Sequence, residues 1–139
     1  MSARIVFLPG DGIGPEVAAA ARACLEKAAR KSGQDLSIEE YAFGGAGIDR
    51  FGDPLPDDTR EACLAADAIF LGAVGGPQWD GHSRRPEQGL LELRQALGVF
   101  ANLRPIQVFA GMEKLSPLAG GRAQKVDLLI VRELTGGLY

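Results

Sequence analysis

The stretch LPGDGIGPEV, residues 8–17, places three glycines within five residues, between a short apolar run and an alanine-rich segment. The preceding run ARIVFL is typical of a buried strand, and the following GPEVAAAARACLEKAARKSG indicates a helix. Pro15 suits the first turn of that helix, Glu16 suits the positive end of its dipole, and Gly33 ends it. The stretch therefore predicts a tight strand-to-helix turn, an arrangement that brings backbone N–H groups near a ligand.

The glycine spacing in this turn differs from the dinucleotide-binding fingerprint. Gly10, Gly12 and Gly14 give G-x-G-x-G with Pro15 next, whereas the fingerprint requires G-x-G-x-x-G. Asp11 lies inside the turn, where its negative charge would repel a phosphate. The pattern argues against a Rossmann-type phosphate site. From this stretch alone, two interpretations stay open: a turn that approaches another ligand, and a turn that is purely structural.

Strand and helix patterns alternate along the chain, which predicts an open, mostly parallel α/β sheet with flanking helices. Further strands are expected over 36–43, 68–74 and 126–134, helices over 57–67 and 90–97, and an extended segment over 100–109. Segments 44–58 and 75–89 are rich in Gly and Pro, so they are predicted to be long loops. Ligands in such sheets bind beyond the carboxyl ends of the strands, where the loops after the first, third and last strands should gather.

Composition excludes several classes of function. Hydrophobic residues make up 46% and charged residues 24% of the 139 residues, as in ordinary globular proteins. The formal net charge is −3 with no long run of one sign, which argues against nucleic acid or an anionic membrane as the main partner. No apolar run approaches the roughly 20 residues of a membrane span, and we expect a cytoplasmic protein.

The cysteines and the histidine narrow the chemistry. Cys24 and Cys63 lie in helical patterns without a CxxC pair, so both are predicted to be buried thiols in a reducing compartment. His82 is the only histidine and lies in a Gly/Arg-rich segment, which disfavours a histidine-based metal site and a Ser-His-Asp triad. Any acid–base chemistry should therefore use tyrosine, lysine or carboxylates.

The segment 75–89 offers a second glycine pair. Gly75 and Gly76 precede Pro77, and backbone exposed by paired glycines can lie against a flat ring or a ribose. The alternative is an ordered surface loop that Trp79 anchors. The sequence of this segment does not decide between the two.

Three arginines indicate an anionic ligand. Arg94 lies beside the apolar stripe of its helix, Arg104 lies in an extended apolar run, and Arg132 lies late in a strand that should be buried. Arginines seldom occupy core elements without an anionic partner, and the guanidinium group suits bidentate binding of carboxylates. For any one of them, an internal ion pair with Glu92 or Glu133 is an alternative, but three together favour an anionic substrate.

Seven motifs in this order resemble the beginning of a β-decarboxylating dehydrogenase of the isocitrate/isopropylmalate dehydrogenase family. They are LPGDGIGPEV, FGGAGID, PLPDDT, GAVGGPQWD, RPEQGLLELR, FANLRP and VRELTGGLY. The resemblance covers essentially the whole chain and implies the family's own α/β fold, not the Rossmann fold, incomplete in this chain. It also implies that residues 1–99 form the first part of an NAD-binding domain and residues 100–139 begin a second domain with substrate and dimer contacts.

The resemblance implies oxidation of a 2-hydroxy dicarboxylate with NAD, followed by loss of the carboxylate β to the new ketone. The expected substrate is 3-isopropylmalate, giving 4-methyl-2-oxopentanoate in leucine biosynthesis. A divalent Mg or Mn ion would polarise the ketone as a Lewis acid. The complete protein is expected to be a homodimer. The alternatives are a tartrate/malate-type or isocitrate-type enzyme of the same family and a non-catalytic, truncated remnant.

Roles for individual residues follow from the matching motifs. Arg94, Arg104 and Arg132 correspond to the clamp for the substrate carboxylates. Tyr139 corresponds to the tyrosine that helps to protonate the enolate after CO2 leaves, and a phenol with an unperturbed pKa of about 10 can donate a proton at neutral pH. The nicotinamide-side NAD contact corresponds to Gly75, Gly76, Pro77 and Glu87.

Leu90 and Leu91 bear on the choice of substrate. Isocitrate enzymes of the family place polar side chains near these positions to hold a third carboxylate. Leucines suit an isopropyl group instead, because burying an unpaired charge costs several kcal/mol whereas apolar contact stabilises by roughly 25 cal/mol per Å². The resemblance therefore implies 3-isopropylmalate rather than isocitrate.

The end of the sequence predicts a longer protein. VDLLIVREL reads as a core strand, yet only TGGLY follows it. The lysine that partners Tyr139, the aspartates that bind the metal, and the segment that separates NAD from NADP are all expected beyond residue 139. We accordingly expect the 139-residue chain to be an N-terminal fragment that is inactive alone.

Overall fold

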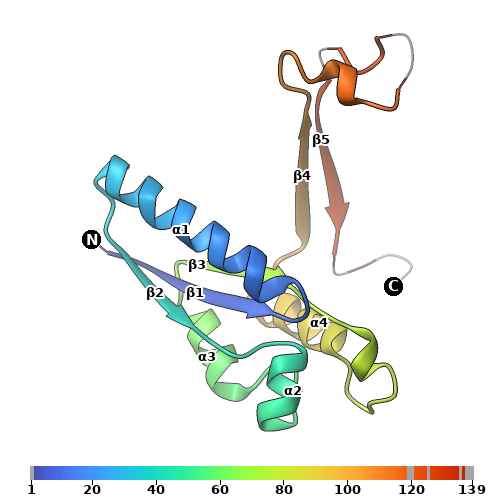
Figure 1. Ribbon diagram of the computed structural model, residues 1–139. Helices are drawn as coiled ribbons and strands as arrows, with labels where there is room; N and C mark the ends of the chain where they lie inside the picture. The colour runs from blue at the N-terminus through green and yellow to red at the C-terminus, as the bar shows by residue number, and fades with distance from the viewer. Residues whose placement is uncertain (1, 119–120, 125, 135, 137–139) are drawn as a thin grey trace. The chain divides into compact units, whose positions relative to one another are not determined.

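A computed structural model describes residues 2–118, 121–124, 126–134 and 136. The chain divides into two compact units, Met1–Gly98 and Val99–Tyr139, which are described separately. The first unit contains, in order, β1 (Ala3–Gly10), α1 (Gly14–Ser32), β2 (Leu36–Glu40), α2 (Gly45–Phe51), α3 (Asp57–Leu64), β3 (Ala68–Ala73), a 3-10 helix (Pro77–Trp79) and α4 (Pro86–Leu97) (Figure 1).

The sheet of the first unit is parallel, with strand order β2-β1-β3. β1 is central, and alternate residues point to opposite faces, so both faces of this strand need apolar side chains. Val6 and Leu8 are fully buried toward one face, while Phe7 stacks on Phe70 of β3 toward the other, with ring centroids 4.8 Å apart. The predicted parallel α/β sheet is confirmed for this unit.

Helices cover both faces of this sheet. In Figure 1, α1 lies on one side of the three strands, and α2, α3 and α4 lie on the other. On the α1 side, the Arg22 guanidinium lies 5.7 Å from the Phe7 ring centroid. The core on the opposite side consists of Val6, Leu8, Phe43, Leu55, Ala62, Cys63 and Leu93. Burial of this cluster holds α3 and α4 against the sheet.

Both segments predicted to be long loops contain helices. α2 lies within 44–58, and its first N–H groups bond to the distant Asp11 rather than to a local cap. Its start is glycine-rich because a Cβ at Gly44 or Gly45 would overlap Asp11 or Trp79. α4 starts four residues before the predicted 90–97. Its extra turn is stabilised by Pro86 in the first turn and by the Arg85 N–H, which donates to Gln88 Oε1 at 2.8 Å.

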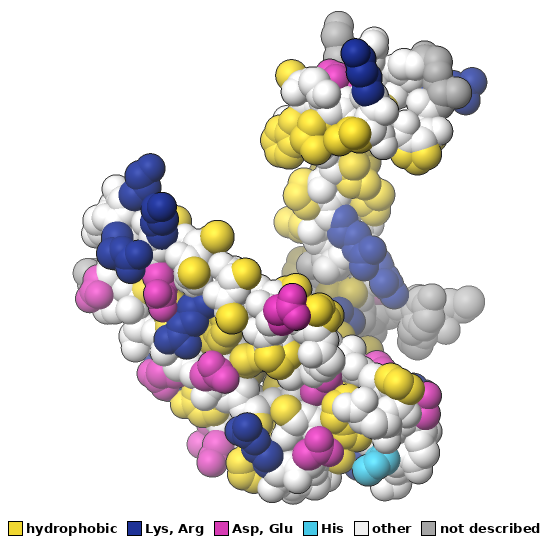
Figure 2. Space-filling view, viewed as in Figure 1, with side chains coloured by type: hydrophobic (Ala, Val, Ile, Leu, Met, Phe, Trp, Pro, Cys, Tyr) yellow, Lys and Arg dark blue, Asp and Glu magenta, His cyan; other side chains and the backbone are white. Residues whose placement is uncertain are grey.

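The second unit is an antiparallel ribbon, β4 (Ala101–Gln107) paired with β5 (Asp127–Glu133), with a 3-10 helix (Glu113–Leu115) between them. The prediction that 126–134 is a buried strand of the parallel sheet is wrong for this chain. β5 is exposed along its length, and Figure 2 shows hydrophobic side chains along the ribbon. The apolar run favoured burial, but a two-stranded sheet on its own buries neither face.

The two cysteines differ in environment. Cys63 on α3 is buried in the core, as predicted, and its burial raises the pKa of the thiol to about 11. Cys24 is exposed, contrary to the prediction, because α1 turns Ala18 and Ala29 toward the sheet instead. The chain therefore carries one accessible thiol and one protected thiol.

We expect iodoacetamide at mildly alkaline pH to alkylate Cys24 rapidly and to spare Cys63 until the chain is unfolded in urea. Only the thiolate reacts, and both burial and the raised pKa keep Cys63 from forming it. Mass spectrometry of the labelled peptides measures both rates, with the variant Cys24→Ser as the control. Equal rates for the two cysteines in the folded chain would contradict this core.

Candidate functional site

The candidate site lies at the carboxyl edge of the parallel sheet. β1 ends at Gly10, β2 at Glu40 and β3 at Ala73, so the segments that follow them leave the sheet at the same edge. This is the edge at which open α/β sheets bind ligands. The glycine-rich turn after β1 and the loop after β3 both begin there, as predicted.

The carboxylate of Asp11 joins these segments. Oδ2 accepts the Gly45 N–H at 2.8 Å and the Gly75 N–H at 2.9 Å, and Oδ1 accepts the Ala46 N–H at 2.9 Å. The side chain is buried, with 4% of its surface exposed, and the Asp11 N–H donates to the Ala73 carbonyl at 2.7 Å. One side chain after β1 thus holds the start of α2, which follows β2, and the loop that follows β3.

Neighbouring glycines leave room for this arrangement. Gly44 has a φ of +69°, and a Cβ there would lie 2.6 Å from Asp11 Oδ2. A Cβ on Gly45 would overlap the ring of Trp79, which packs over the start of α2. Trp79 is buried, and its Nε1–H donates to Asp49 Oδ1 at 3.0 Å. Trp79 therefore anchors its loop to α2, as one of the two interpretations of that loop supposed.

Sequence reasoning missed the structural role of Asp11. From the sequence, Asp11 was interpreted only as a negative charge that would repel a phosphate. Its position between two glycines, directly after a buried strand, was the available signal, because an acid there faces the backbone N–H groups of neighbouring loops. Its partners at Gly45 and Gly75 lie 34 and 64 residues away and could not be identified from the sequence.

Two of the residues predicted to bind the cofactor, Gly75 and Glu87, lie close together. Gly75 has a φ of +102°, and Glu87 Oε1 lies so near that a Cβ on Gly75 would be 2.6 Å from it. Gly12 also faces this point, since a Cβ there would lie 3.9 Å from the Gly75 carbonyl oxygen. Gly76 is extended, and Pro77 opens the 3-10 helix. Backbone and a carboxylate are thus presented side by side at the sheet edge.

One face of α4 carries three of the residues predicted for the site. Glu87, Leu91 and Arg94 follow the i, i+4, i+7 spacing that aligns side chains along a helix. Leu91 is 52% exposed, whereas Leu90 is half-buried and packs against the core. Arg94 is half-buried, and among the described residues its side chain has no hydrogen-bond or ion-pair partner. The face thus offers an acid, an apolar group and a cation in series.

The suggested internal pair between Arg94 and Glu92 does not form. Glu92 Oε1 lies 3.1 Å from Arg84 Nη1, and its Oε2 lies 3.9 Å from Arg60 Nη2. Residues two apart on a helix point in different directions, so Glu92 and Arg94 cannot face each other. Glu92 is therefore not the partner of Arg94.

Arg104 and Arg132 lie on the same face of the second unit's ribbon. Asn102 is paired with Arg132 and Arg104 with Ile130, so the two arginines are diagonal neighbours on adjacent strands. Arg104 Nε–H donates to Asn102 Oδ1 at 2.6 Å, and Arg132 makes interactions of its own. Both lie on exposed strands, not in the buried setting that we expected. Tyr139 lies outside the described residues.

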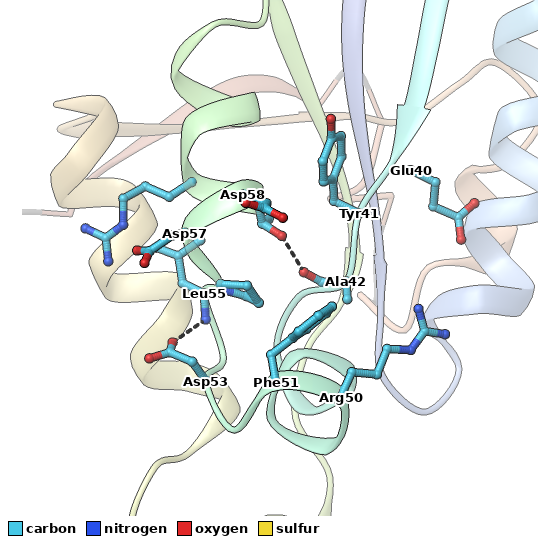
Figure 3. Close-up of a pocket in the computed structure, with 12 residues that line it drawn as sticks. Glu40, Tyr41, Ala42, Arg50, Phe51, Asp53, Leu55, Asp57 and Asp58 are labelled. Carbon is cyan, nitrogen blue, oxygen red and sulfur yellow. Dashed lines mark hydrogen bonds between the residues drawn. The ribbon is translucent and has the colours of Figure 1, made fainter.

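A cavity of about 520 Å³ lies elsewhere in the first unit, beside the end of β2 (Figure 3). Its lining includes Tyr41, Phe51 and Asp57, and none of the residues that we predicted for the site. Two of its polar groups already bond internally: Thr59 Oγ1–H donates to the Ala42 carbonyl at 2.9 Å, and the Leu55 N–H donates to Asp53 at 2.8 Å. The cavity thus lies apart from the residues predicted for the site.

Two features are absent from the described part of the chain. It contains no group of three or more His, Cys, Asp or Glu side chains placed to hold a metal ion. No helix in it combines the length and apolar character needed to cross a membrane.

The fold and the loops at the sheet edge define a class of protein. Residues 4–139 match the family model described as isocitrate/isopropylmalate dehydrogenase, and the chain belongs to this family. The resemblance inferred from the seven motifs is confirmed.

Curated relatives and solved structures agree with this assignment. The chain is 55% identical to the 3-isopropylmalate dehydrogenases of Listeria innocua and Staphylococcus haemolyticus over all 139 residues, and it spans 40% of the length of each. The isocitrate dehydrogenase of Methylococcus capsulatus aligns with a TM-score of 0.76 and 35% identity, over 99% of this chain and 36% of that one. A β-decarboxylating dehydrogenase of Thermococcus kodakarensis aligns with a TM-score of 0.69 and 30% identity, over 96% and 34%.

We expect Asp11→Asn to destabilise the first unit by about 1–3 kcal/mol, because an amide oxygen cannot replace two carboxylate oxygens for three buried donors. Urea unfolding, followed by the fluorescence of the single tryptophan, Trp79, measures the change. The control is Asp67→Asn, since Asp67 accepts one exposed N–H, from Arg4, at 2.8 Å. A loss no larger than that of the control would show that Asp11 does not hold the loops together.

Proposed function

We propose that this chain supplies the N-terminal part of an NAD-dependent 3-isopropylmalate dehydrogenase. The complete enzyme would convert 3-isopropylmalate to 4-methyl-2-oxopentanoate with reduction of NAD, in leucine biosynthesis. The observation that carries the proposal is the face of α4, where Glu87, Leu91 and Arg94 are aligned. The 55% identity to proteins named 3-isopropylmalate dehydrogenase supports the same choice.

In this proposal, Arg94, Arg104 and Arg132 bind the substrate's carboxylates. A guanidinium group donates two parallel hydrogen bonds to a carboxylate and stays charged at every physiological pH. The shared strand face of Arg104 and Arg132 and the lack of a described partner for Arg94 support these roles. Tyr139 donates a proton to the enolate carbon after decarboxylation, with its phenol protonated at neutral pH.

Leu90 and Leu91 receive the isopropyl group. Leu91 offers its exposed side chain beside Arg94, and Leu90 supports that surface from the core. Isocitrate carries a carboxylate in place of the isopropyl group. That carboxylate would lose water without gaining a donor from the leucines, so the apolar surface disfavours an isocitrate-type enzyme. A tartrate- or malate-type enzyme would also leave these leucines without an apolar partner.

Residues 1–99 form the first part of the NAD-binding domain, and residues 100–139 begin the second domain. Gly75, Gly76 and Pro77 expose backbone beside the Glu87 carboxylate, which suits the hydroxyls of the nicotinamide ribose. The described residues offer no metal-binding cluster, so no step is assigned to a metal, and Mg or Mn enters from the family alone. A cytoplasmic homodimer is likewise proposed from the family.

The direct test is turnover by the complete protein. We expect NADH formation with 3-isopropylmalate and Mg, and a kcat/KM for isocitrate lower by orders of magnitude. We also expect Leu90→Ser and Leu91→Ser each to lower kcat/KM for isopropylmalate about 10- to 100-fold, because each removes apolar contact with the isopropyl group. The control Leu64→Ser alters a leucine on α3 that is 55% exposed, close to the 52% of Leu91. Full preference for isopropylmalate in both test variants would refute the assignment of the leucines.

The 139-residue chain alone should produce no NADH from isopropylmalate and NAD in the presence of Mg or Mn. The chain spans 40% of the length of its relatives, and the resemblance assigns the lysine base partner and the metal ligands to the remainder. Absorbance of NADH in an assay with concentrated, purified chain measures the rate. A rate that rises in proportion to chain concentration would contradict the prediction.

A further inference from the structure

Two consecutive arginines before α4 have different partners. Arg84 Nη2 lies 3.1 Å and 3.2 Å from the two carboxylate oxygens of Asp53, and its Nη1 and Nη2 each lie 3.1 Å from an oxygen of Glu92. Arg85 Nη2 lies 3.2 Å from Asp80, and its Nε lies 3.6 Å from Glu87. Arg85 therefore pairs with the loop and the first turn of α4, whereas Arg84 connects the loop to two other parts of the unit.

The two acids that bind Arg84 are held in place themselves. Asp53 Oδ1 also accepts the Leu55 N–H, a bond drawn in Figure 3, and Leu55 is fully buried. Gly89 of α4 packs so closely on Pro54 that a Cβ would lie 2.9 Å from the Pro54 carbonyl oxygen. Glu92 follows on the same helix. The guanidinium group thus bridges α4 and the α2–α3 segment where they already pack together.

The loop over 75–85 has three anchors along its length. The Gly75 N–H donates to Asp11 at its start, the Trp79 indole donates to Asp49 in its middle, and Arg84 bridges Asp53 and Glu92 at its end. Glu87 follows in the first turn of α4, where its carboxylate lies against Gly75. Arg84, the last of these anchors, lies only three residues before Glu87. Its contacts therefore influence the position of the Glu87 carboxylate.

The charges in this cluster are balanced. The cluster contains two arginines, Arg60 and Arg84, and two acids, Asp53 and Glu92. The hydrogen bond that Arg84 donates to Glu92, together with the charge of Asp53, raises the pKa of Arg84 above its ordinary value. Without Arg84, Glu92 would keep only its weak, 3.9 Å contact with Arg60, and Asp53 would lose its ion pair with Arg84. Their repulsion would then act on the end of the loop.

We propose that Arg84 is a positioning residue for the cofactor: by bridging Asp53 and Glu92, it fixes the end of the loop so that the Glu87 carboxylate lies at Gly75, ready for the nicotinamide ribose. The inference rests on the proposed function, because that function places NAD at Gly75 and Glu87. Arg84 does not touch NAD in this scheme and acts only through Glu87.

The test uses the complete enzyme with Arg84→Met. We expect the KM for NAD and the Kd for NADH, measured by NADH fluorescence, to rise about five- to tenfold. The kcat and the KM for isopropylmalate should stay within about twofold of the wild-type values. Arg84→Lys should give an intermediate loss, since a single ammonium group cannot span two carboxylates as a guanidinium fork does.

Two further variants separate positioning from other effects. Glu92→Gln removes the other side of the bridge with the opposite change of charge. Positioning predicts a raised KM for NAD in both Arg84→Met and Glu92→Gln, whereas simple attraction of the anionic cofactor predicts a lowered KM in Glu92→Gln. Arg4→Met is the matched control: Arg4 lies at the start of β1, pairs with Glu39 at 3.2 Å, and is 38% exposed against 40% for Arg84.

The outcomes are distinct. An unchanged KM for NAD in Arg84→Met, a lowered KM in Glu92→Gln, or an equal rise in Arg4→Met would each overturn the proposal. A wild-type enzyme that binds NADH without oxidising isopropylmalate would refute the proposed function instead. In that case the NADH Kd of the variants still decides the role of Arg84.

Discussion

The buried Asp11 carboxylate is the interaction on which the rest of the first unit's site depends. A carboxylate removed from water is costly unless hydrogen bonds replace its hydration, and here three backbone N–H groups do so. Because the donors come from the segments after β2 and β3, these two segments and the turn after β1 cannot shift independently. Two glycines of FGGAGID fit this requirement, since side chains at Gly44 or Gly45 would occupy the space of Asp11 or Trp79.

This constraint extends from the sheet edge to α4. Asp11 fixes Gly75, the loop continues through Trp79 and Arg84, and α4 then presents Glu87, Leu91 and Arg94 along one face. A helix keeps residues four and seven apart at fixed separations, so Leu91 and Arg94 hold constant positions relative to Glu87. The residues proposed for the cofactor, and Leu90, Leu91 and Arg94 among those proposed for the substrate, thus lie on one continuous stretch of chain, whereas Arg104 and Arg132 lie on the ribbon of the second unit.

The sequence predicted elements whose signals are local, and it failed where distant partners decide. Alternating or continuous apolar residues identified β1, α1 and β3, and the loops after β1 and β3 begin at the expected edge of the sheet. α2 was missed because its start is stabilised by Asp11, which no local pattern reveals. The burial of β5 was overestimated because an apolar run shows only that a strand can be covered, whereas coverage depends on elements elsewhere. The ion pair suggested for Arg94 failed for a local reason, because a spacing of two residues on a helix already excludes Glu92 as its partner.

The contrast between the two units has a consequence for biosynthesis. The first unit buries an apolar core between its sheet and its helices. The ribbon emerges later and displays the uncharged run 128–131 on an exposed strand. Short, uncharged segments of high β-propensity are those that associate with one another when they are left uncovered. During synthesis, this exposed, uncharged strand therefore stays open to association with other strands until another element covers it.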